Sequence, residues 1–235
     1  MEGFLFINKP ADITSHDCIN HIKKIFGKKI KIGHAGTLDP FATGLLIIGI
    51  GRAATRILKH LTKRPKEYIS TGKLNILTDT LDRIGTTVEE KNITINQMQL
   101  MKAIKQFSES YEQIPPKFSA LKFQGKPLYK LARQGLANLE KILAIKKRTV
   151  HIYRIELLNF EFPFFTIKTE VSSGTYIRSL LYDIAQKMGT IATTWELCRT
   201  KIGDINLDQA INLNEIQSFE DIENNLHSIE GIFLT

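Results

Sequence analysis

Hydrophobic residues occur along the chain in short runs and at two spacings, which predict both strands and helices. Unbroken or alternating apolar runs predict strands at 4–7, 45–50, 68–76, 150–160 and 165–171. Apolar residues three and four positions apart predict helices at 15–26, 95–107, 177–188 and, more briefly, 128–135. Because the strands come in groups and do not alternate strictly with helices, the sequence favours the α+β class over a doubly wound sheet.

Polar and small residues mark where several of these helices begin and end. Thr14 or Ser15 is expected to cap the first helix, and Gly27 to end it. Ser173 is expected to cap a helix whose apolar positions run from Ile177 to Met188 and which Gly189 ends. The apolar positions expected to define the buried face of the 95–107 helix are Met98, Met101, Ile104 and Phe107.

The composition is typical of a globular protein with one large domain or two small ones. The chain has 235 residues, of which 43% are hydrophobic. Its two cysteines, Cys18 and Cys198, form neither a disulfide framework nor a metal-ligand pattern, and Cys18 lies among isoleucines as a small buried residue does. With no signal pattern and no apolar run of about 18 residues, the expected location is cytoplasmic.

Charge is distributed unevenly along the chain, whose net charge is +8. Residues 117–154 contain ten Lys or Arg and one acid, Glu140, so this segment carries +9 and the remainder sums to −1. After Lys201 the chain has seven acids and no Lys or Arg. A concentrated basic segment suits a polyanion such as nucleic acid, although a solvated charged surface is the alternative explanation.

The most informative segment is Gly33–Gly44, which reads G-H-A-G-T-L-D-P-F-A-T-G. It places one carboxylate, Asp39, in a loop with three glycines and a proline, directly before the predicted strand at 45–50. Gly and Pro permit unusual backbone angles and a close approach to a ligand. An isolated L-D-P could simply brace a turn, whereas a rigid strand beside this loop favours a chemical role for Asp39.

Further short motifs occur in a fixed order around this loop. They are Lys9-Pro10; Tyr68 with Gly72, Thr78-Asp79-Thr80, Asp82 and Gly85; Gln113-Ile114-Pro115-Pro116, Ser119-Ala120-Leu121-Lys122 and Ala132-Arg133-Gln134-Gly135; Ser173-Gly174-Thr175-Tyr176-Ile177-Arg178-Ser179-Leu180; and Leu197-Cys198-Arg199-Thr200 with Gly203. Together with the aspartate loop, this set resembles the TruB-type family of bacterial tRNA pseudouridine-55 synthases over roughly residues 3–203.

The resemblance implies the pseudouridine synthase fold, with a central, mostly antiparallel mixed sheet flanked by helices. It implies a catalytic domain over 1–203 with an inserted RNA-binding thumb at about 117–148. Members of the family usually continue into a small C-terminal RNA-binding (PUA) domain. Residues 204–235 are acidic and too few for a complete one, so a short acidic extension is expected here.

The resemblance also assigns roles to residues at the expected reaction centre. Asp39 is the essential carboxylate, which either attacks the sugar or base or assists elimination to a glycal. Arg178 is its expected partner, holding the carboxylate charged and oriented. Tyr68 and Tyr176 are expected to clamp the flipped base by stacking, and Tyr68 is also a candidate for proton transfer.

Three further residues are expected to bind or position the substrate. His34 is expected to help displace the target nucleotide from its folded loop, without proton chemistry. Lys9 is expected either to brace the catalytic loop or to contact phosphate. Arg199 is expected to line the site, beside Cys198, where many relatives have Arg.

The resulting hypothesis is an enzyme that isomerises uridine 55 in the T loop of tRNA to pseudouridine, without a cofactor or metal. The expected partner is the T stem-loop of tRNA, with no membrane, no obligate protein partner and a monomeric state. One alternative is a non-catalytic tRNA-binding or tRNA-remodelling protein on the same fold. Another is a guide-RNA-dependent synthase, a kind that relies on the C-terminal RNA-binding domain.

Overall fold

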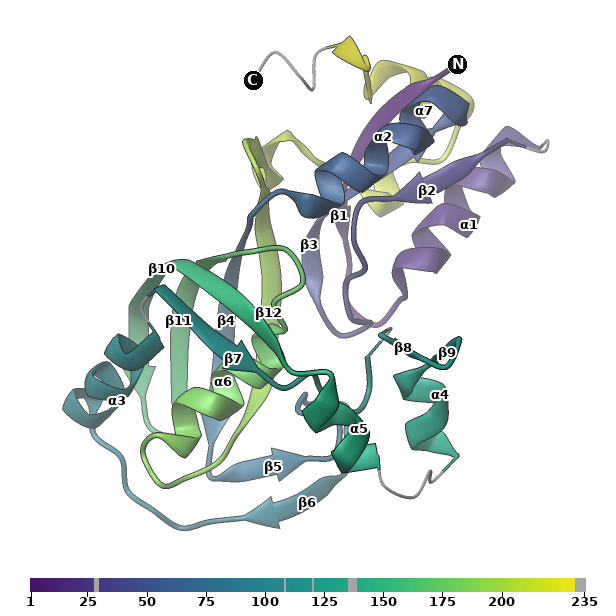
Figure 1. Ribbon diagram of the computed structural model, residues 1–235. Coiled ribbons are helices and arrows are strands. Elements are labelled where there is room, and N and C mark those ends of the chain that lie inside the picture. Colours follow the sequence, from purple (N-terminus) through teal and green to yellow (C-terminus); the bar gives the residue numbers. More distant parts are fainter. Residues whose placement is uncertain (28–29, 108, 120, 135–138, 231–235) are drawn as a thin grey trace. The chain divides into compact units, whose positions relative to one another are not determined.

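The computed structural model describes the chain except for residues 28–29, 108, 120, 135–138 and 231–235, so Ala120 and Gly135 of the quoted motifs lie outside the described residues. The chain divides into two compact units (Figure 1). Unit 1 contains residues 1–69 and 197–235, and unit 2 contains residues 70–196. The chain passes from one unit to the other within two strands, β4 (Lys66–Leu74) and β12 (Ala192–Ile202).

Unit 1 is built on a central pair of antiparallel strands, β1 (Gly3–Lys9) and β3 (Thr43–Ile50). Around this pair, β14 (Ile211–Asn212) and β12 add in parallel, while β2 (Ile32–His34) and β15 (Leu226–His227) add antiparallel to β3 and β1. The short strand β13 (Ile205–Asn206) pairs with the end of β12. The predicted strands at 4–7 and 45–50 are confirmed.

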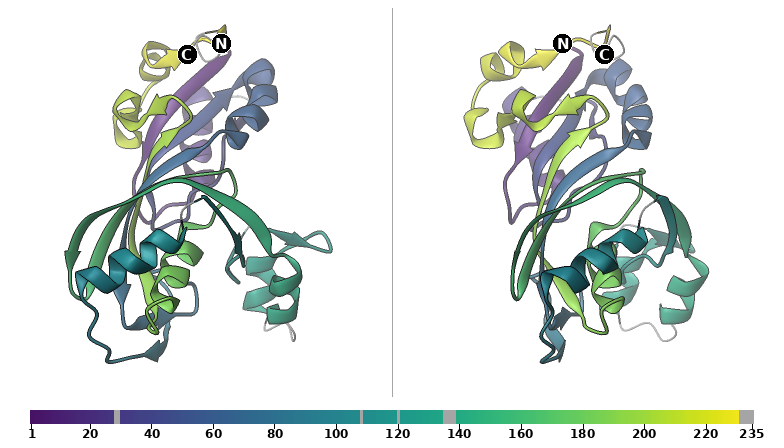
Figure 2. Two further views of the ribbon diagram at one scale, coloured as in Figure 1. Left: turned by 60° about the vertical axis from the view of Figure 1, so that its left-hand side comes forward. Right: turned by 90° about the vertical axis from the view of Figure 1, so that its left-hand side faces the viewer.

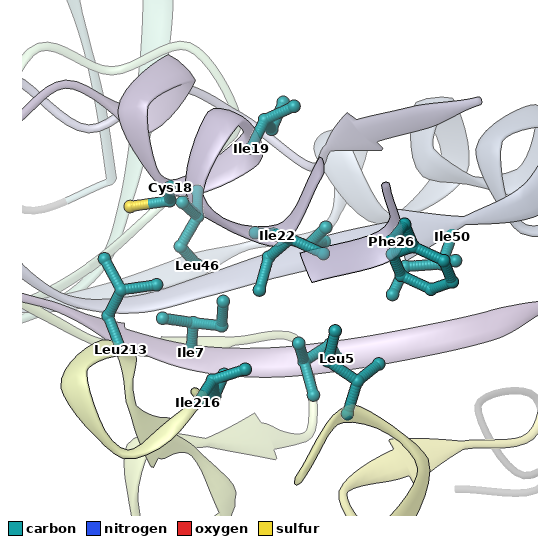
Figure 3. Close-up of a cluster of buried hydrophobic side chains, with 12 residues drawn as sticks. Leu5, Ile7, Cys18, Ile19, Ile22, Phe26, Leu46, Ile50, Leu213 and Ile216 are labelled. Carbon is teal, nitrogen blue, oxygen red and sulfur yellow. The ribbon is translucent and has the colours of Figure 1, made fainter. Parts of the chain in front are cut away.

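The central strands are apolar on both faces because helices cover both faces. Side chains from alternate positions, such as Leu5 and Leu46, pack with α1 (Ser15–Phe26) in the cluster drawn in Figure 3. The intervening positions, such as Phe6 and Leu45, pack with α2 (Gly51–Lys63). Burial of each such side chain contributes roughly 1.5–3 kcal/mol, so this double-sided core supplies much of the stability of unit 1.

The predicted ends of α1 are confirmed. Thr14 is the N-cap, and its side chain accepts a hydrogen bond from Asp17 N while Asp17 in return binds the Thr14 backbone. Gly27 ends the helix with a left-handed φ of 59°, which glycine adopts without steric cost. The sequence had left Thr14 and Ser15 open as the cap, and Ser15 instead turns inward.

The residues after β13 complete the core of unit 1. They form η2 (Leu207–Gln209), β14, η3 (Leu213–Glu215), α7 (Phe219–Asn224) and β15. Leu213, Ile216 and Ile222 are buried in the α1 cluster, where Figure 3 shows Leu213 and Ile216 near Ile7. The turns that carry Leu213, Ile216 and Ile222 lie on the opposite side of the strands from α2 (Figure 2), whereas Leu207 of η2 packs in the cluster on the α2 side. The described part of the acidic segment, residues 204–230, therefore packs into unit 1, and six of its seven acids are exposed.

Unit 2 contains the strands β7 (Glu109–Gln113), β10 (Arg148–Glu161) and β11 (Phe164–Val171), paired antiparallel in the order β7–β10–β11. Its main helices are α3 (Gln97–Ile104), continued by η1 (Lys105–Phe107), and α6 (Ile177–Gln186). A separate ribbon pairs β5 (Ile76–Thr78) with β6 (Thr87–Glu90). The pairing is mixed and mostly antiparallel, which confirms the predicted fold class.

The expected thumb insertion lies between β7 and β10. It contains the hairpin of β8 (Lys122–Phe123) and β9 (Lys126–Pro127), followed by α4 (Leu128–Arg133) and α5 (Leu139–Ile145). Leu128, Leu131 and Leu143 form a small core of their own. The brief helix predicted near 128–135 is confirmed, and its own core lets this insertion hold its shape.

Two predictions about helices in unit 2 are wrong. Met98 is 79% exposed and Met101 is also exposed, because Leu100 and Ala103 are buried in their place, whereas Ile104 and Phe107 are buried as expected. Methionines mark a buried face poorly when a neighbouring leucine competes for it. Ser173 does not cap α6, since the N-cap residue is Tyr176 and no side chain caps that end.

Across the described residues, no helix has the length and apolar character to cross a membrane.

Candidate active site

The aspartate loop of unit 1 connects β2 to β3 and is fixed at both ends. On entering, Ala35 N donates to Ile47 O at 2.9 Å. On leaving, Gly44 has a φ of 102°, and a Cβ atom there would lie 2.4 Å from Arg199 O. Gly44 is required because β12 passes directly against the loop, leaving no room for a side chain.

The residues on either side of Asp39 are held by the segment 9–15. Ser15 Oγ donates to Leu38 O at 3.2 Å and accepts from Leu38 N at 2.9 Å. Asp12 N and Lys9 Nζ both donate to Pro40 O, at 2.8 and 3.1 Å. The backbone of Leu38 and Pro40 is therefore fixed, while the Asp39 side chain is half-buried. This arrangement fixes the stretch of backbone from which the Asp39 carboxylate projects.

Lys9 braces this loop, which is one of the two roles the sequence left open. Its side chain is 0% exposed, and Nζ also donates to Pro10 O and Ile13 O at 2.7 and 2.8 Å. Burial lowers the pKa of Lys9 to about 8, and the negative charges of Asp12 and Asp39 are among those that oppose this shift. Contact with substrate stays a prediction for Lys9.

Arg199 holds the opposite side of the loop. Its guanidinium is buried and donates to Leu45 O at 2.8 Å and Gly36 O at 3.2 Å. Gly36 has a φ of 89°, so the carbonyl turns toward the guanidinium at a position that favours glycine. Arg199 thus ties β12 to both ends of the aspartate loop, as a residue lining the site would.

His34 lies at the end of β2, half-buried. Burial lowers its pKa, and the positive charge of Arg199 lowers it further. The imidazole is therefore neutral near pH 7, which is compatible with the expected positioning role without proton chemistry.

Tyr68 is buried on the inward face of β4. Lys66 occupies the same face two residues earlier, and its Nζ donates to Arg64 O at 2.7 Å and to Thr62 O. The strand is thus anchored to the end of α2 immediately before Tyr68. A buried position agrees with a ring that meets a base inside a closed site, and the clamp role itself stays a prediction.

Arg178 of unit 2 lies in the first turn of α6, as predicted, and is 3% exposed. Its Nη1 donates to Thr80 O at 2.6 Å and lies 3.2 Å from Asp82 Oδ2, while Nη2 donates to Phe118 O at 2.8 Å. Asp82 is itself held by Thr80 Oγ1 and Ile84 N. Asp39 belongs to unit 1, so the pairing of Arg178 with Asp39 stays a prediction.

Two residues outside the predicted set hold Tyr176. The Gln113 amide is 0% exposed; its Oε1 accepts from Tyr176 N at 2.8 Å, and its Nε2 donates to Tyr176 O at 3.0 Å and to Tyr111 Oη. The Arg148 guanidinium lies 4.7 Å from the centre of the Tyr176 ring. Gln113 pairs with the Tyr176 backbone as a strand would, which sets the start of α6.

The predicted site residues therefore form two groups. Lys9, His34, Asp39, Tyr68 and Arg199 belong to unit 1, and Tyr176 and Arg178 to unit 2. The supporting residues that were not predicted as site residues are Ser15, Asp82, Gln113 and Arg148. Asp82 and Gln113 lie in motifs already noted, but only the fold reveals which main-chain atoms they hold.

The chain is similar to known proteins over nearly its whole length. Residues 23–177 match the model of the TruB family pseudouridylate synthase (N terminal domain). Proteins named tRNA pseudouridine synthase B are 41% identical in Thermosipho melanesiensis and 43% in Clostridium tetani; each match covers 92% of this chain, and 69% and 73% of the relatives. In Protochlamydia amoebophila the identity is 41%, over 96% of this chain and 84% of that protein.

Solved structures also include chains that are similar to this one over most of its length. A chain in the crystal structure of a Cbf5-Nop10-Gar1 complex matches with a TM-score of 0.68 and 28% identity, over 91% of this chain and 53% of that one. A chain of an H/ACA RNP bound to a substrate RNA containing 2′-deoxyuridine matches with a TM-score of 0.68 and 25% identity. This match covers 96% of this chain and 56% of that one. This chain thus spans about half the length of those two. From its aspartate loop, its motif order and these matches, the chain belongs to the TruB family of pseudouridylate synthases.

Proposed function

We propose that this protein isomerises uridine 55 in the T loop of tRNA to pseudouridine, acting as a monomer in the cytoplasm. The observation that carries the proposal is the aspartate loop. Asp39 is half-buried, and the backbone on both sides of it is fixed by Ser15, Asp12 and Lys9. Relatives about 40% identical over most of this chain are named tRNA pseudouridine synthase B.

The reaction needs no external reagent. The N1–C1′ bond of uridine breaks, the base rotates, and a C5–C1′ bond forms; C5 loses its proton and N1 gains one, so atoms and electrons balance. Asp39 either forms a transient bond to the substrate or removes a proton during elimination to a glycal. Both routes require a charged carboxylate held close to the ribose, and a fixed backbone reduces the entropy lost on reaching that geometry.

The remaining site residues fit a flipped nucleotide. Extruding a base costs a few kcal/mol, and stacking on an aromatic ring returns roughly 1–3 kcal/mol. Tyr68 and Tyr176 are the proposed stacking partners, and Tyr68 is also the candidate for the final proton transfer. Arg178, at the start of α6, is proposed to hold Asp39 charged and oriented.

The thumb is proposed to grip the T stem-loop. Its basic residues lie on a segment with its own apolar core, so the charges are carried on a preformed surface. Recognition then depends on the folded loop and its phosphates more than on strand sequence. Binding is expected to weaken steeply with salt, and a flat salt response would contradict this assignment of the thumb.

The decisive experiment compares wild type, Asp39→Asn and Asp208→Asn on a tRNA transcript, scoring pseudouridine at position 55 and tRNA affinity. Asp208 is an exposed aspartate of the same unit, so Asp208→Asn controls for the loss of a charge. Asp39→Asn is expected to lower the rate on the order of 10³-fold or more with nearly unchanged affinity.

Two outcomes would contradict the proposal. If wild type binds tRNA and yields no pseudouridine even at stoichiometric enzyme, the protein is a tRNA-binding or remodelling protein instead. If Asp39→Asn loses tRNA binding in parallel with product, the carboxylate is structural.

A further inference from the structure

Helix α2 of unit 1 has a concentration of positive charge that lies outside the thumb. The segment 51–66 contains six Lys or Arg and no acid. Four of them, Arg52, Arg56, Lys59 and Lys63, are exposed. We refer to these four as the α2 stripe. The overall charge balance hides the stripe, because acids elsewhere offset it.

The stripe lies on one face of the helix. Its members are spaced four, three and four residues apart, which places them within a narrow arc of an α-helix. The buried residues Ala54, Leu58 and Leu61 lie on the opposite side, against the strands. The stripe therefore points away from the core of unit 1. It is about 16 Å long, a length over which a nucleic acid strand carries several phosphates.

This arrangement is unfavourable for the helix alone. Like charges four residues apart repel, and a cation in the first turn opposes the helix dipole. The Glu2 carboxylate compensates only the N-terminal end, where it accepts from Arg52 N and Ala53 N. Among the described residues, the ion pairs within 4.0 Å include none formed by the stripe, whereas the neighbouring Arg64 pairs with Asp204.

We propose that the α2 stripe binds backbone phosphates of the tRNA substrate outside the T stem-loop. This inference rests on the proposed function. The Asp39 loop precedes β3 and α2 follows it, so Arg52 lies a strand length, roughly 25 Å, from the loop. That separation carries the stripe beyond the nucleotides that enter the site. An unpaired row of cations at that distance matches the backbone of another tRNA region.

The test uses two substrates, a full-length tRNA transcript and an isolated T stem-loop. The variant Lys59→Gln/Lys63→Gln removes two stripe charges, and Lys102→Gln/Lys187→Gln removes two exposed lysines of unit 2 as the matched control. Gln is a good helix former, so α2 is expected to keep its fold.

For the stripe variant, KM for the full transcript is expected to rise roughly three- to tenfold with kcat unchanged, and the salt dependence of binding to become shallower. KM for the T stem-loop and both values for the control are expected to stay near wild type. A stripe variant that behaves like the control, or that weakens both RNAs equally, would overturn the inference.

Dissociation constants measured alongside keep this inference separate from the proposed function. A wild type that binds but does not modify tRNA contradicts the proposed activity alone. In that case, equal affinities of wild type and stripe variant for the full transcript would overturn the stripe as well, and a selective loss would support it.

Discussion

The two parts of the candidate site are held by buried cations in different ways. Around Asp39, Lys9 and Arg199 donate to main-chain carbonyls on both sides of the loop. At the start of α6, Arg178 combines two carbonyls with the carboxylate of Asp82. The first arrangement fixes the shape of a loop, and the second fixes a charge beside the helix. In unit 1, therefore, buried cations fix the main chain of the aspartate loop. In unit 2, main-chain carbonyls and a carboxylate fix the position of a guanidinium.

Breaking the ion pair of unit 2 is expected to have the largest effect. Asp82→Asn removes the carboxylate charge that lies 3.2 Å from the buried Arg178 guanidinium, which is expected to lower the free energy of unfolding by about 3–5 kcal/mol. Urea denaturation measures this change. Asp79→Asn is the matched control, since Asp79 is exposed in the same motif and Asn still accepts from Thr86 N. Equal stabilities of the two variants would show that Asp82 does not carry the pair.

Removing the brace of unit 1 is expected to affect rate more than stability. Lys9→Met deletes three hydrogen bonds but also a buried charge, so the stability terms partly cancel. The loop around Asp39 loses its anchor at Pro40, and kcat is expected to fall on the order of a hundredfold, with KM nearly unchanged. Lys31→Met, at an exposed lysine before the loop, is the control. A Lys9→Met enzyme with wild-type kcat would rule out the bracing role.

A smaller effect is expected where the Gln113 side chain supports Tyr176. Gln113→Glu keeps the shape but replaces the donor that faces Tyr176 O, so the start of α6 is expected to shift and kcat to fall about tenfold. Gln106→Glu, at an exposed position of η1, controls for the added charge. Gln113→Met provides an uncharged second variant. If both Gln113 variants keep wild-type kcat, the amide does not position Tyr176.

The smallest expected effect is a dependence on pH of the stability that Lys9 contributes to unit 1. The pKa of Lys9 is lowered to about 8 by burial, from 10.5. Between these values the unfolded chain binds more protons than the folded one, so the folded state gains stability as pH rises. The free energy of unfolding of wild type relative to Lys9→Met is therefore expected to increase from pH 8 to about 10.5, by on the order of 1 kcal/mol after screening. A constant difference across that window would mean that Lys9 keeps its ordinary pKa.

The sequence predicted the strands at the centre of unit 1 because residues buried on both faces form unbroken apolar runs. It failed for α3, where Met98 and Met101 fit the helical period but Leu100 and Ala103 take the buried face. The helical period alone does not show which of two apolar stripes on one helix is the buried one. The cap at Ser173 failed for a related reason, since a capping residue type shows where a helix can begin and tertiary contacts decide where it does.

The site residues also divide into those that local sequence motifs predicted and those whose role depends on tertiary contacts. Asp39, Arg178 and the tyrosines could be predicted as site residues because their motifs have unusual residue types at fixed spacings. Ser15, Asp82 and Gln113 were not assigned a role, because a serine, an aspartate or a glutamine becomes a support only when a distant main-chain atom is brought within about 3 Å. The burial of Lys9 and its three bonds to main-chain carbonyls favour the bracing alternative, and no local sequence pattern reports them.

By itself, then, the sequence determined the class of fold and the family, and it predicted Asp39 as the essential carboxylate, since these follow from local residue types in a fixed order. Only the tertiary structure decided which groups fix the backbone around Asp39 and which face of α2 carries the exposed row of cations. The reason is physical: hydrogen bonds to main-chain carbonyls and the burial of a charge depend on residues far apart in the chain, and folding alone brings them together.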